Sequence, residues 1–229
     1  MRRAPLIPML ALGLIVAGCG SSTSDSAAPS TEATTGASDT ATAAGCTDVD
    51  VPAAREDGGA TAPKERLDPE KTYRLVVKTN CGSFTITLDL EKAPATSASL
   101  VSLAKSGFYD AMVFHRIVPG FVIQGGDPTQ SGSGGPGYKT VDPPPADASY
   151  VKGVVAMAKT TAEPPGTSGS QFFVVTGADA GLPPEYAVVG KVTTGMPVVD
   201  RIDALGDPAD PEGKPTSPVV IESVTVVER

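Results

Sequence analysis

The sequence predicts a mainly β protein, a closed antiparallel barrel with two helices. Three observations support this fold class. Short apolar runs follow one another from residue 73 to the C-terminus, separated by glycine and proline. Only two stretches have a helical pattern, and each has proline where a first turn accepts it. All six Phe and all five Tyr lie between Tyr73 and Tyr186, so the core begins near Tyr73.

The first two strands are expected to form a hairpin. Residues 73–78 are followed by Asn80-Cys81-Gly82, a sequence that favours a turn. In residues 84–90, apolar side chains at even positions alternate with polar ones at odd positions, which is typical of a half-buried strand.

The remaining elements follow in order along the chain. A helix is predicted to begin at Pro94 and to end at Gly107, with Leu100 and Leu103 on its apolar face. Further strands are predicted at 112–118, 121–124, 153–158, 172–176 and 187–192, a short helix at 197–204, and a closing strand at 219–227.

Composition excludes several classes of function. The chain carries 18 basic and 26 acidic residues, a net charge of −8, whereas nucleic-acid binding needs clustered positive charge. The chain has one histidine and no CxxC pair, so neither a zinc site nor a redox motif is expected. We therefore predict no metal, no cofactor and no nucleic-acid partner.

The N-terminus predicts a targeting segment. Arg2 and Arg3 precede a mostly apolar run at 6–16, which is shorter than the roughly 20 residues of a membrane-spanning helix. The run ends in Val-Ala-Gly-Cys, which resembles the bacterial lipobox. We predict a signal peptide at 1–18, acylation of Cys19 with chains such as palmitate, and an extracytoplasmic protein anchored to the cell membrane. Plain secretion without an anchor is the alternative.

Two segments separate this anchor from the core. Residues 19–45 are rich in Ser, Thr, Ala and Gly and lack aromatic residues, which predicts a disordered tether. Residues 46–72 are expected to be an extended transitional segment, because glycine and proline interrupt them. Export permits a disulfide between Cys46 and Cys81, closing a loop of about 35 residues at a gain of roughly 4 kcal/mol. Two unpaired thiols are the alternative.

Two motifs carry the chemistry. They are FHRIVPGFVIQGGD at 114–127 and GSQFF at 169–173. Residues two apart in a strand share a face, so Gln124 lies beside Val122, and Gln171 beside Phe173. Each strand therefore pairs an amide with an apolar side chain on one face. Such a face predicts a groove for an extended peptide.

Both motifs resemble the cyclophilin family of peptidyl-prolyl cis–trans isomerases, and the likeness extends from Tyr73 to the C-terminus. The resemblance implies an eight-stranded barrel capped by two α-helices at 73–229. It also implies an isomerase that needs no cofactor and acts on proline-containing polypeptides. If the enzyme is exported, we expect its substrates to be exported proteins. We expect a monomer.

The resemblance also implies roles for individual residues. Arg116 matches the catalytic arginine, and Gln124 matches the side chain that holds the peptide backbone. The residues that match the proline pocket are Phe121, Val122, Phe173 and Leu182. The other positions expected to line the substrate site are His115, Ala158, Lys159, Gln171 and Tyr186.

Three positions depart from the family pattern. Lys159-Thr160 stands where Asn-Ala is usual, which changes the local charge. Gly181 stands where many members carry Trp, which implies weak inhibition by cyclosporin. Tyr186 replaces a histidine that is common in eukaryotic members, and its phenol is expected to line the same pocket.

The sequence allows two other interpretations. Residues 132–137 satisfy GxGxxG, but prolines follow them instead of a helix, so a loop is predicted and not a dinucleotide site. A non-catalytic peptide-binding or holdase module with the same groove is the alternative to an enzyme, because fold alone does not guarantee turnover.

Overall fold

The computed structural model describes residues 45–229. The predicted signal peptide, Cys19 and nearly all of the predicted tether lie outside the described residues. The elements within them are β1 (Tyr73–Thr79), β2 (Gly82–Leu88), α1 (Pro94–Lys105), β3 (Met112–Val113), β4 (Arg116–Val118), β5 (Val122–Gly125), β6 (Thr140–Val141), β7 (Val154–Met157), β8 (Thr167–Ser168), β9 (Phe172–Val175), β10 (Val188–Thr194), α2 (Met196–Asp203) and β11 (Val220–Glu228).

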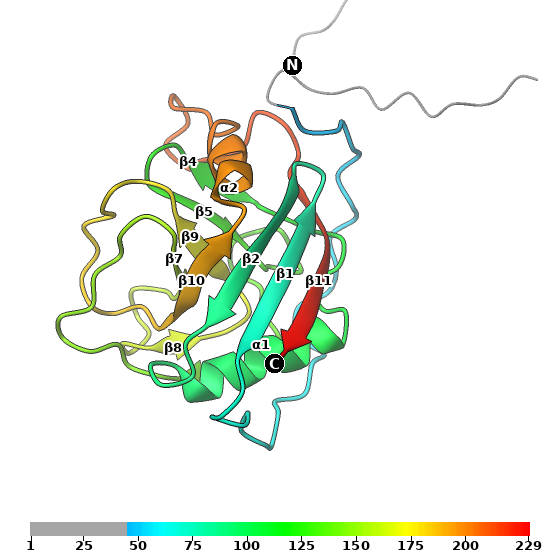
Figure 1. Ribbon diagram of the computed structural model, residues 1–229. Helices are drawn as coiled ribbons and strands as arrows, with labels where there is room; N and C mark the ends of the chain where they lie inside the picture. The colour runs from blue at the N-terminus through cyan, green and yellow to red at the C-terminus, as the bar shows by residue number, and fades with distance from the viewer. Residues whose placement is uncertain (1–44) are drawn as a thin grey trace, which may run out of the picture. The chain divides into compact units, whose positions relative to one another are not determined.

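Nine of the strands form one curled antiparallel sheet in the order β3-β11-β1-β2-β10-β7-β9-β5-β4 (Figure 1). The helices α1 and α2 lie at opposite ends of this sheet. The short strands β6 and β8 form a separate pair that the sequence analysis did not predict. The mainly β class with two helices is therefore confirmed.

The predicted closed eight-stranded barrel is not confirmed. Residues 112–118 form two short strands, because β3 pairs with β11 and β4 pairs with β5. These two strands are the ends of the sheet, although only two residues separate them in the chain. The segment that precedes β11 forms hydrogen bonds with this part of the chain, since the amide of Phe114 donates to the carbonyl of Val219 and the amide of Ile117 to that of Gly213.

The main core fills the curled sheet. In β2 the buried Phe84, Ile86 and Leu88 alternate with partly exposed residues, as the period-two pattern predicted. Helix α1 covers one end of the core with Leu100 and Leu103. The predicted Leu90 lies beyond the end of β2 and is only partly buried.

A distant carboxylate stabilises the start of α1. No side chain caps the helix at Ala93, but Asp142 accepts hydrogen bonds from the amide and the hydroxyl of Thr96, each at 2.6 Å. Asp142 follows β6, whose pairing with β8 fixes its position. A negative charge at this end is also favoured by the helix dipole.

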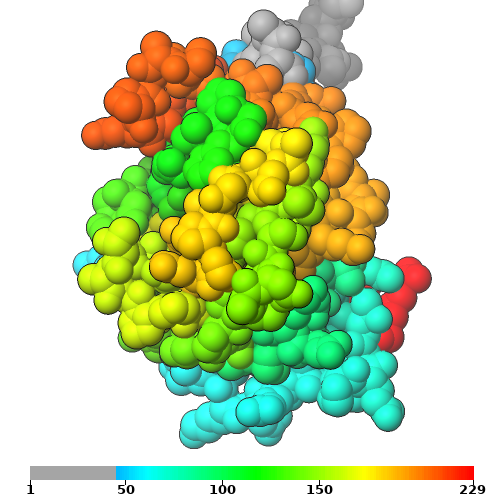
Figure 2. Space-filling view, turned by 90° about the vertical axis from the view of Figure 1, so that its left-hand side faces the viewer, coloured from blue at the N-terminus to red at the C-terminus, as the bar shows by residue number. Residues whose placement is uncertain are grey.

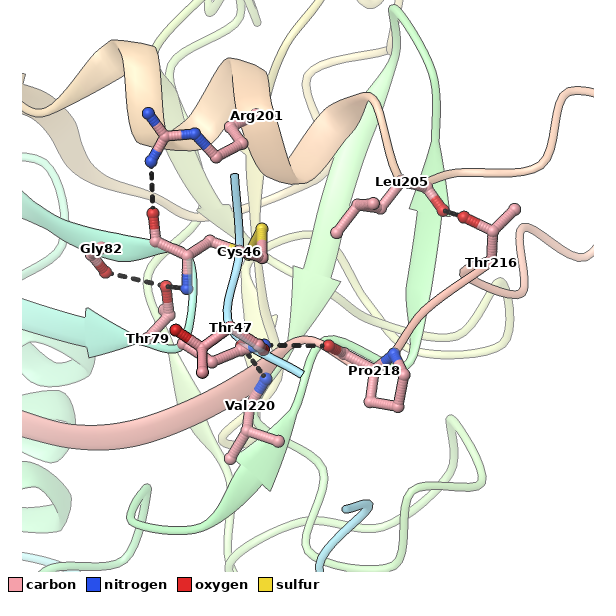
Figure 3. Close-up of a disulfide and its surroundings, with 11 residues drawn as sticks. Cys46, Thr47, Thr79, Gly82, Arg201, Leu205, Thr216, Pro218 and Val220 are labelled. Atoms are coloured by element: carbon pink, nitrogen blue, oxygen red, sulfur yellow. Dashed lines mark hydrogen bonds between the residues drawn. A yellow bond between two sulfur atoms is a disulfide. The ribbon is translucent and has the colours of Figure 1, made fainter. Parts of the chain in front are cut away.

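Cys46 and Cys81 form a disulfide across a separation of 35 residues (Figure 3). Arg201 of α2 donates to the carbonyl of Cys81 at 2.6 Å, so α2, the turn between β1 and β2, and the segment that contains Cys46 meet at the disulfide.

Residues 48–72 contain no helix or strand. Within residues 45–229, no helix has both the length and the apolar character to cross a membrane.

Candidate active site

Three predicted site residues lie in a row across the sheet. Arg116 of β4 is paired with Gln124 of β5, and Gln124 is paired with Phe173 of β9. Directly paired residues of antiparallel strands point to the same face, and neighbouring strands are about 4.8 Å apart. The strand pairing therefore brings a guanidinium, an amide and an aromatic ring together, although 57 positions separate the first from the last.

An apolar cluster separate from the main core forms the floor beside this row. Its buried members include Val122, Phe173 and Val175. The predicted site residues that pack against it are Phe121, Ala158, Leu182 and Tyr186. Ile123 and Phe172, which alternate with the site residues in β5 and β9, lie in the main core. The alternation that the sequence predicted is confirmed.

The two glutamine amides are held in fixed orientations. Nε2 of Gln124 donates to Oε1 of Gln171 at 3.0 Å, and Nε2 of Gln171 donates to the carbonyl of Gly134 at 2.9 Å. Gln171 is only 8% exposed. Because the chain of bonds leaves Oε1 of Gln124 as an acceptor, this amide can receive a hydrogen bond from a bound peptide.

Arg116 is half-buried beside the apolar cluster. Its guanidinium carbon lies 5.8 Å from the centroid of the Phe121 ring, within range of a cation–π contact. Among residues 45–229, no carboxylate forms an ion pair with it. Its charge is therefore available to a ligand in the adjoining groove.

His115 lies next to Arg116 and points into the protein. Both imidazole nitrogens are buried and have no hydrogen-bond partner among the described residues. Burial lowers the pKa of His115, the nearby Asp127 opposes this effect, and Arg116 lowers the pKa further. A neutral imidazole fits the lining role that the sequence predicted, without acid–base work.

Asp127 organises a loop that was not predicted to belong to the site. This loop, residues 127–137, is called the site loop. The carboxylate accepts hydrogen bonds from the amide and hydroxyl of Thr129 and from the amides of Gly132 and Gly134. Burial raises the pKa of Asp127, but these four bonds outweigh burial and hold the pKa below its usual value.

Lys159, a departure from the family pattern, is paired within the protein. Its side chain is 2% exposed and forms an ion pair with Glu185 at 2.8 Å. Its Nζ also donates to the carbonyl of Glu163 at 3.1 Å and lies 5.5 Å from the centroid of the Tyr186 ring. The charge that was expected to alter the site is therefore balanced by Glu185.

Tyr150 supports the aromatic wall and was missed by the sequence analysis. Its hydroxyl donates to the carbonyl of Tyr186 at 2.8 Å and accepts from the amide of Tyr186 at 3.0 Å. The Tyr186 ring meets the Phe173 ring edge-on at 5.6 Å. Tyr150 is distant in sequence from both motifs, so no local pattern marked it.

A groove of about 680 Å³ adjoins the row of site residues. Val51, Arg116, Gln124 and residues 214–219 are among its lining, and a smaller hollow lies between the site loop and Lys159. Figure 2 shows the segment near residue 120 in green beside the segment near residue 180 in yellow, and the amide of Thr176 donates to the carbonyl of Phe121.

Within residues 45–229, no group of potential ligands could hold a metal ion.

A guanidinium without an ion-pair partner among the described residues, two fixed amides and an apolar floor beside an open groove define a protein suited to bind extended peptides. The sequence matches the family model "Cyclophilin type peptidyl-prolyl cis-trans isomerase/CLD" over residues 74–226. The chain belongs to the cyclophilin family and is a peptidyl-prolyl cis–trans isomerase.

Individual relatives agree with this assignment. The chain is 39% identical over 176 residues to peptidyl-prolyl cis-trans isomerase A of Mycobacterium tuberculosis, covering 69% of this chain and 94% of the relative. A probable isomerase A of Mycobacterium leprae is 40% identical over 166 residues, covering 65% and 88%. A crystal structure of a cyclophilin-type isomerase of Cryptosporidium parvum superposes with a TM-score of 0.61 at 30% identity, covering 68% and 98%.

Proposed function

We propose that this enzyme isomerises Xaa-Pro bonds of exported proteins, with Arg116 as the catalytic residue. The observation that carries the proposal is the row of Arg116, Gln124 and Phe173 across three strands. It sets a guanidinium without an ion-pair partner among the described residues beside an apolar cluster.

The reaction requires stabilisation of a twisted amide. Rotation about an Xaa-Pro bond takes tens to hundreds of seconds because it breaks amide resonance. Acceleration to milliseconds needs about 7 kcal/mol of selective stabilisation. As the bond twists, the prolyl nitrogen gains a localised lone pair, and the guanidinium of Arg116 donates to it more strongly than to the planar amide. This difference in binding between the twisted and planar states is the source of the catalysis.

The other site residues would hold the peptide while the bond turns. We expect the proline ring to enter a slot between Phe121, Val122, Phe173 and Leu182 of the apolar cluster, and Oε1 of Gln124 to accept a hydrogen bond from the peptide backbone. The backbone at Ala158-Lys159 would pair with the peptide, and His115 and Tyr186 would line the ends of the slot. A crystal structure of the Cryptosporidium parvum relative was determined in the presence of the dipeptide Ala-Pro, at 30% identity and a TM-score of 0.60.

Substitution of Arg116 tests this assignment. We expect Arg116→Ala to lower kcat/KM on an Xaa-Pro peptide by about 100-fold or more, the usual loss for one transition-state donor, while peptide affinity changes little. Arg66→Ala, an exposed arginine outside the site, is the control and should retain activity. If wild type accelerates no Xaa-Pro peptide and still binds such peptides, the chain is a holdase and the catalytic assignment is wrong.

We further propose that the enzyme acts as a monomer outside the cytoplasm, anchored by acyl chains on Cys19. The lipobox-like sequence before Cys19 supports this location. Mass spectrometry of the mature N-terminus should find acylated Cys19, and Cys19→Ser should release the enzyme from membranes. A mature protein that begins elsewhere without lipid contradicts the anchor and leaves the isomerase assignment intact.

A further inference from the structure

The segment of residues 46–60, here called the strap, precedes the part of the chain that matches the family model. It runs along the site loop and forms backbone hydrogen bonds with it. The amide of Arg55 donates to Pro128, the amide of Gly58 to Gly135, and the amide of Ala60 to Pro136, at 2.7, 3.0 and 3.0 Å. The strap and the site loop are therefore joined along most of their length.

Two side chains add to this junction from opposite sides. Oδ1 of Asp57 accepts from the amide of Gly135 at 2.7 Å, and Nε2 of Gln130 donates to the carbonyl of Pro52 at 2.8 Å. Gly135 follows directly on Gly134, whose carbonyl holds the Gln171 amide. A displacement of the strap would thus reach Gln171 through two adjacent residues.

The strap also supplies a side chain to the substrate groove. Val51 lines the groove together with Arg116 and Gln124, and it is 56% exposed. It lies next to Pro52, whose carbonyl accepts a hydrogen bond from Gln130 of the site loop, so the backbone at Val51 is held beside the groove. An exposed apolar side chain on the wall of a peptide groove favours an apolar residue of the bound peptide.

The disulfide holds the strap at its start. Beside the disulfide, Asn80 exchanges hydrogen bonds with Thr47. The side-chain Nδ2 of Asn80 donates to the Thr47 carbonyl at 2.8 Å, and the backbone carbonyl of Asn80 accepts from the Thr47 amide at 2.9 Å. The same Nδ2 donates to the carbonyl of Pro218 at 3.2 Å, and Pro218 also lines the groove. Figure 3 shows Cys46, Thr47 and Pro218 together at this point.

We propose that the strap is part of the substrate site. It positions the site loop, and through it the amides of Gln171 and Gln124, and it presents Val51 to an apolar residue flanking the proline of the peptide. The Cys46–Cys81 disulfide keeps the strap docked, so reduction of the disulfide lowers peptide affinity. The inference rests on the proposed function of this groove.

Asp57→Ala in the full chain tests the positioning role. We expect KM for a peptide with apolar residues flanking proline to rise about fivefold, equal to about 1 kcal/mol, with kcat within about twofold. Backbone amides of the site loop should exchange hydrogen faster. Glu56→Ala, the neighbouring carboxylate with an equal change in charge, should leave both unchanged. Wild-type KM and exchange in Asp57→Ala overturn the positioning role.

Val51→Ser tests the contact with the peptide. It should raise KM for the apolar-flanked peptide several-fold, by loss of buried apolar surface, and leave KM for a glycine-flanked peptide unchanged. An equal change for both peptides, or none for either, overturns the contact.

The paired variant Cys46→Ser/Cys81→Ser should raise KM and site-loop exchange as Asp57→Ala does. Should this variant fail to fold, Asp57→Ala and Val51→Ser still decide the inference. Activity retained in Arg116→Ala contradicts the catalytic assignment alone. An inactive Arg116→Ala together with wild-type KM in every strap variant overturns the strap inference alone.

Discussion

Replacement of Asp127 by asparagine tests how strongly one carboxylate organises the site loop. Oδ1 accepts from the amide and hydroxyl of Thr129 at 2.7 and 2.8 Å, and Oδ2 accepts from the amides of Gly132 and Gly134 at 2.6 and 3.2 Å. Asparagine keeps one oxygen, but its NH₂ group would face the two glycine amides, which are also donors. Two hydrogen bonds to a charged acceptor are therefore lost.

The magnitude follows from the type of bond. Each hydrogen bond to a charged group contributes about 1.5–3 kcal/mol. Because Gly132 is exposed and its amide can bind water, the lower end applies, and Asp127→Asn should cost about 3 kcal/mol of the free energy of unfolding. The variant should also raise KM, since Gly134 holds Gln171.

Urea unfolding at several pH values measures this cost. The pKa of Asp127 is lowered in the folded protein, so its stabilisation is complete above the unfolded pKa of about 3.9 and is lost as the pH falls through the folded value. The difference between wild type and variant should stay constant from pH 7 to about 5 and shrink below about 4. Asp147→Asn, at an exposed aspartate, is the control. A loss below about 1 kcal/mol at pH 7, or a difference that grows in acid, refutes the reasoning.

Three further predictions concern residues near the site or the fold that supports it. The pKa of His115 is lowered in the folded protein, so the unfolded chain binds a proton first and wild-type stability falls below about pH 6.5. His115→Gln should remove this fall, which urea unfolding at pH 7 and 5.5 measures; a variant that loses as much stability between these pH values as wild type contradicts the prediction. Asp142→Ala should lower the free energy of unfolding by about 2 kcal/mol, because it removes the two hydrogen bonds to Thr96 at the start of α1. Thermal melting measures this loss, and a melting temperature equal to that of Asp147→Ala would show that these bonds do not stabilise the helix. Lys159→Met should lower the free energy of unfolding by only about 1 kcal/mol, because its partner Glu185 is 45% exposed and regains water. A double-mutant cycle with Glu185→Gln measures the coupling energy, and a coupling of about 3 kcal/mol or more contradicts this prediction.

Local patterns predicted most of the elements because those patterns record burial directly. Pro94 begins α1 as expected, and the alternation in residues 84–88 matches the buried face of β2. The prediction of one strand at 112–118 was wrong, because Phe114 and His115 lie in a break between β3 and β4. Hydrogen bonds to residues far along the chain produce that break, and periodicity carries no sign of them.

The sequence alone determined that Gln124 and Phe173 lie on faces opposite to Ile123 and Phe172, because side chains alternate strictly along a strand. The two motifs predicted that Arg116 belongs to the same site, but the pairing of β4, β5 and β9 placed it in a row with Gln124 and Phe173. Only the tertiary structure decided that Tyr150 supports the aromatic wall, that Glu185 balances Lys159, and that the strap borders the groove. These contacts join residues that are distant along the chain, and the packing of the folded domain alone sets their distances.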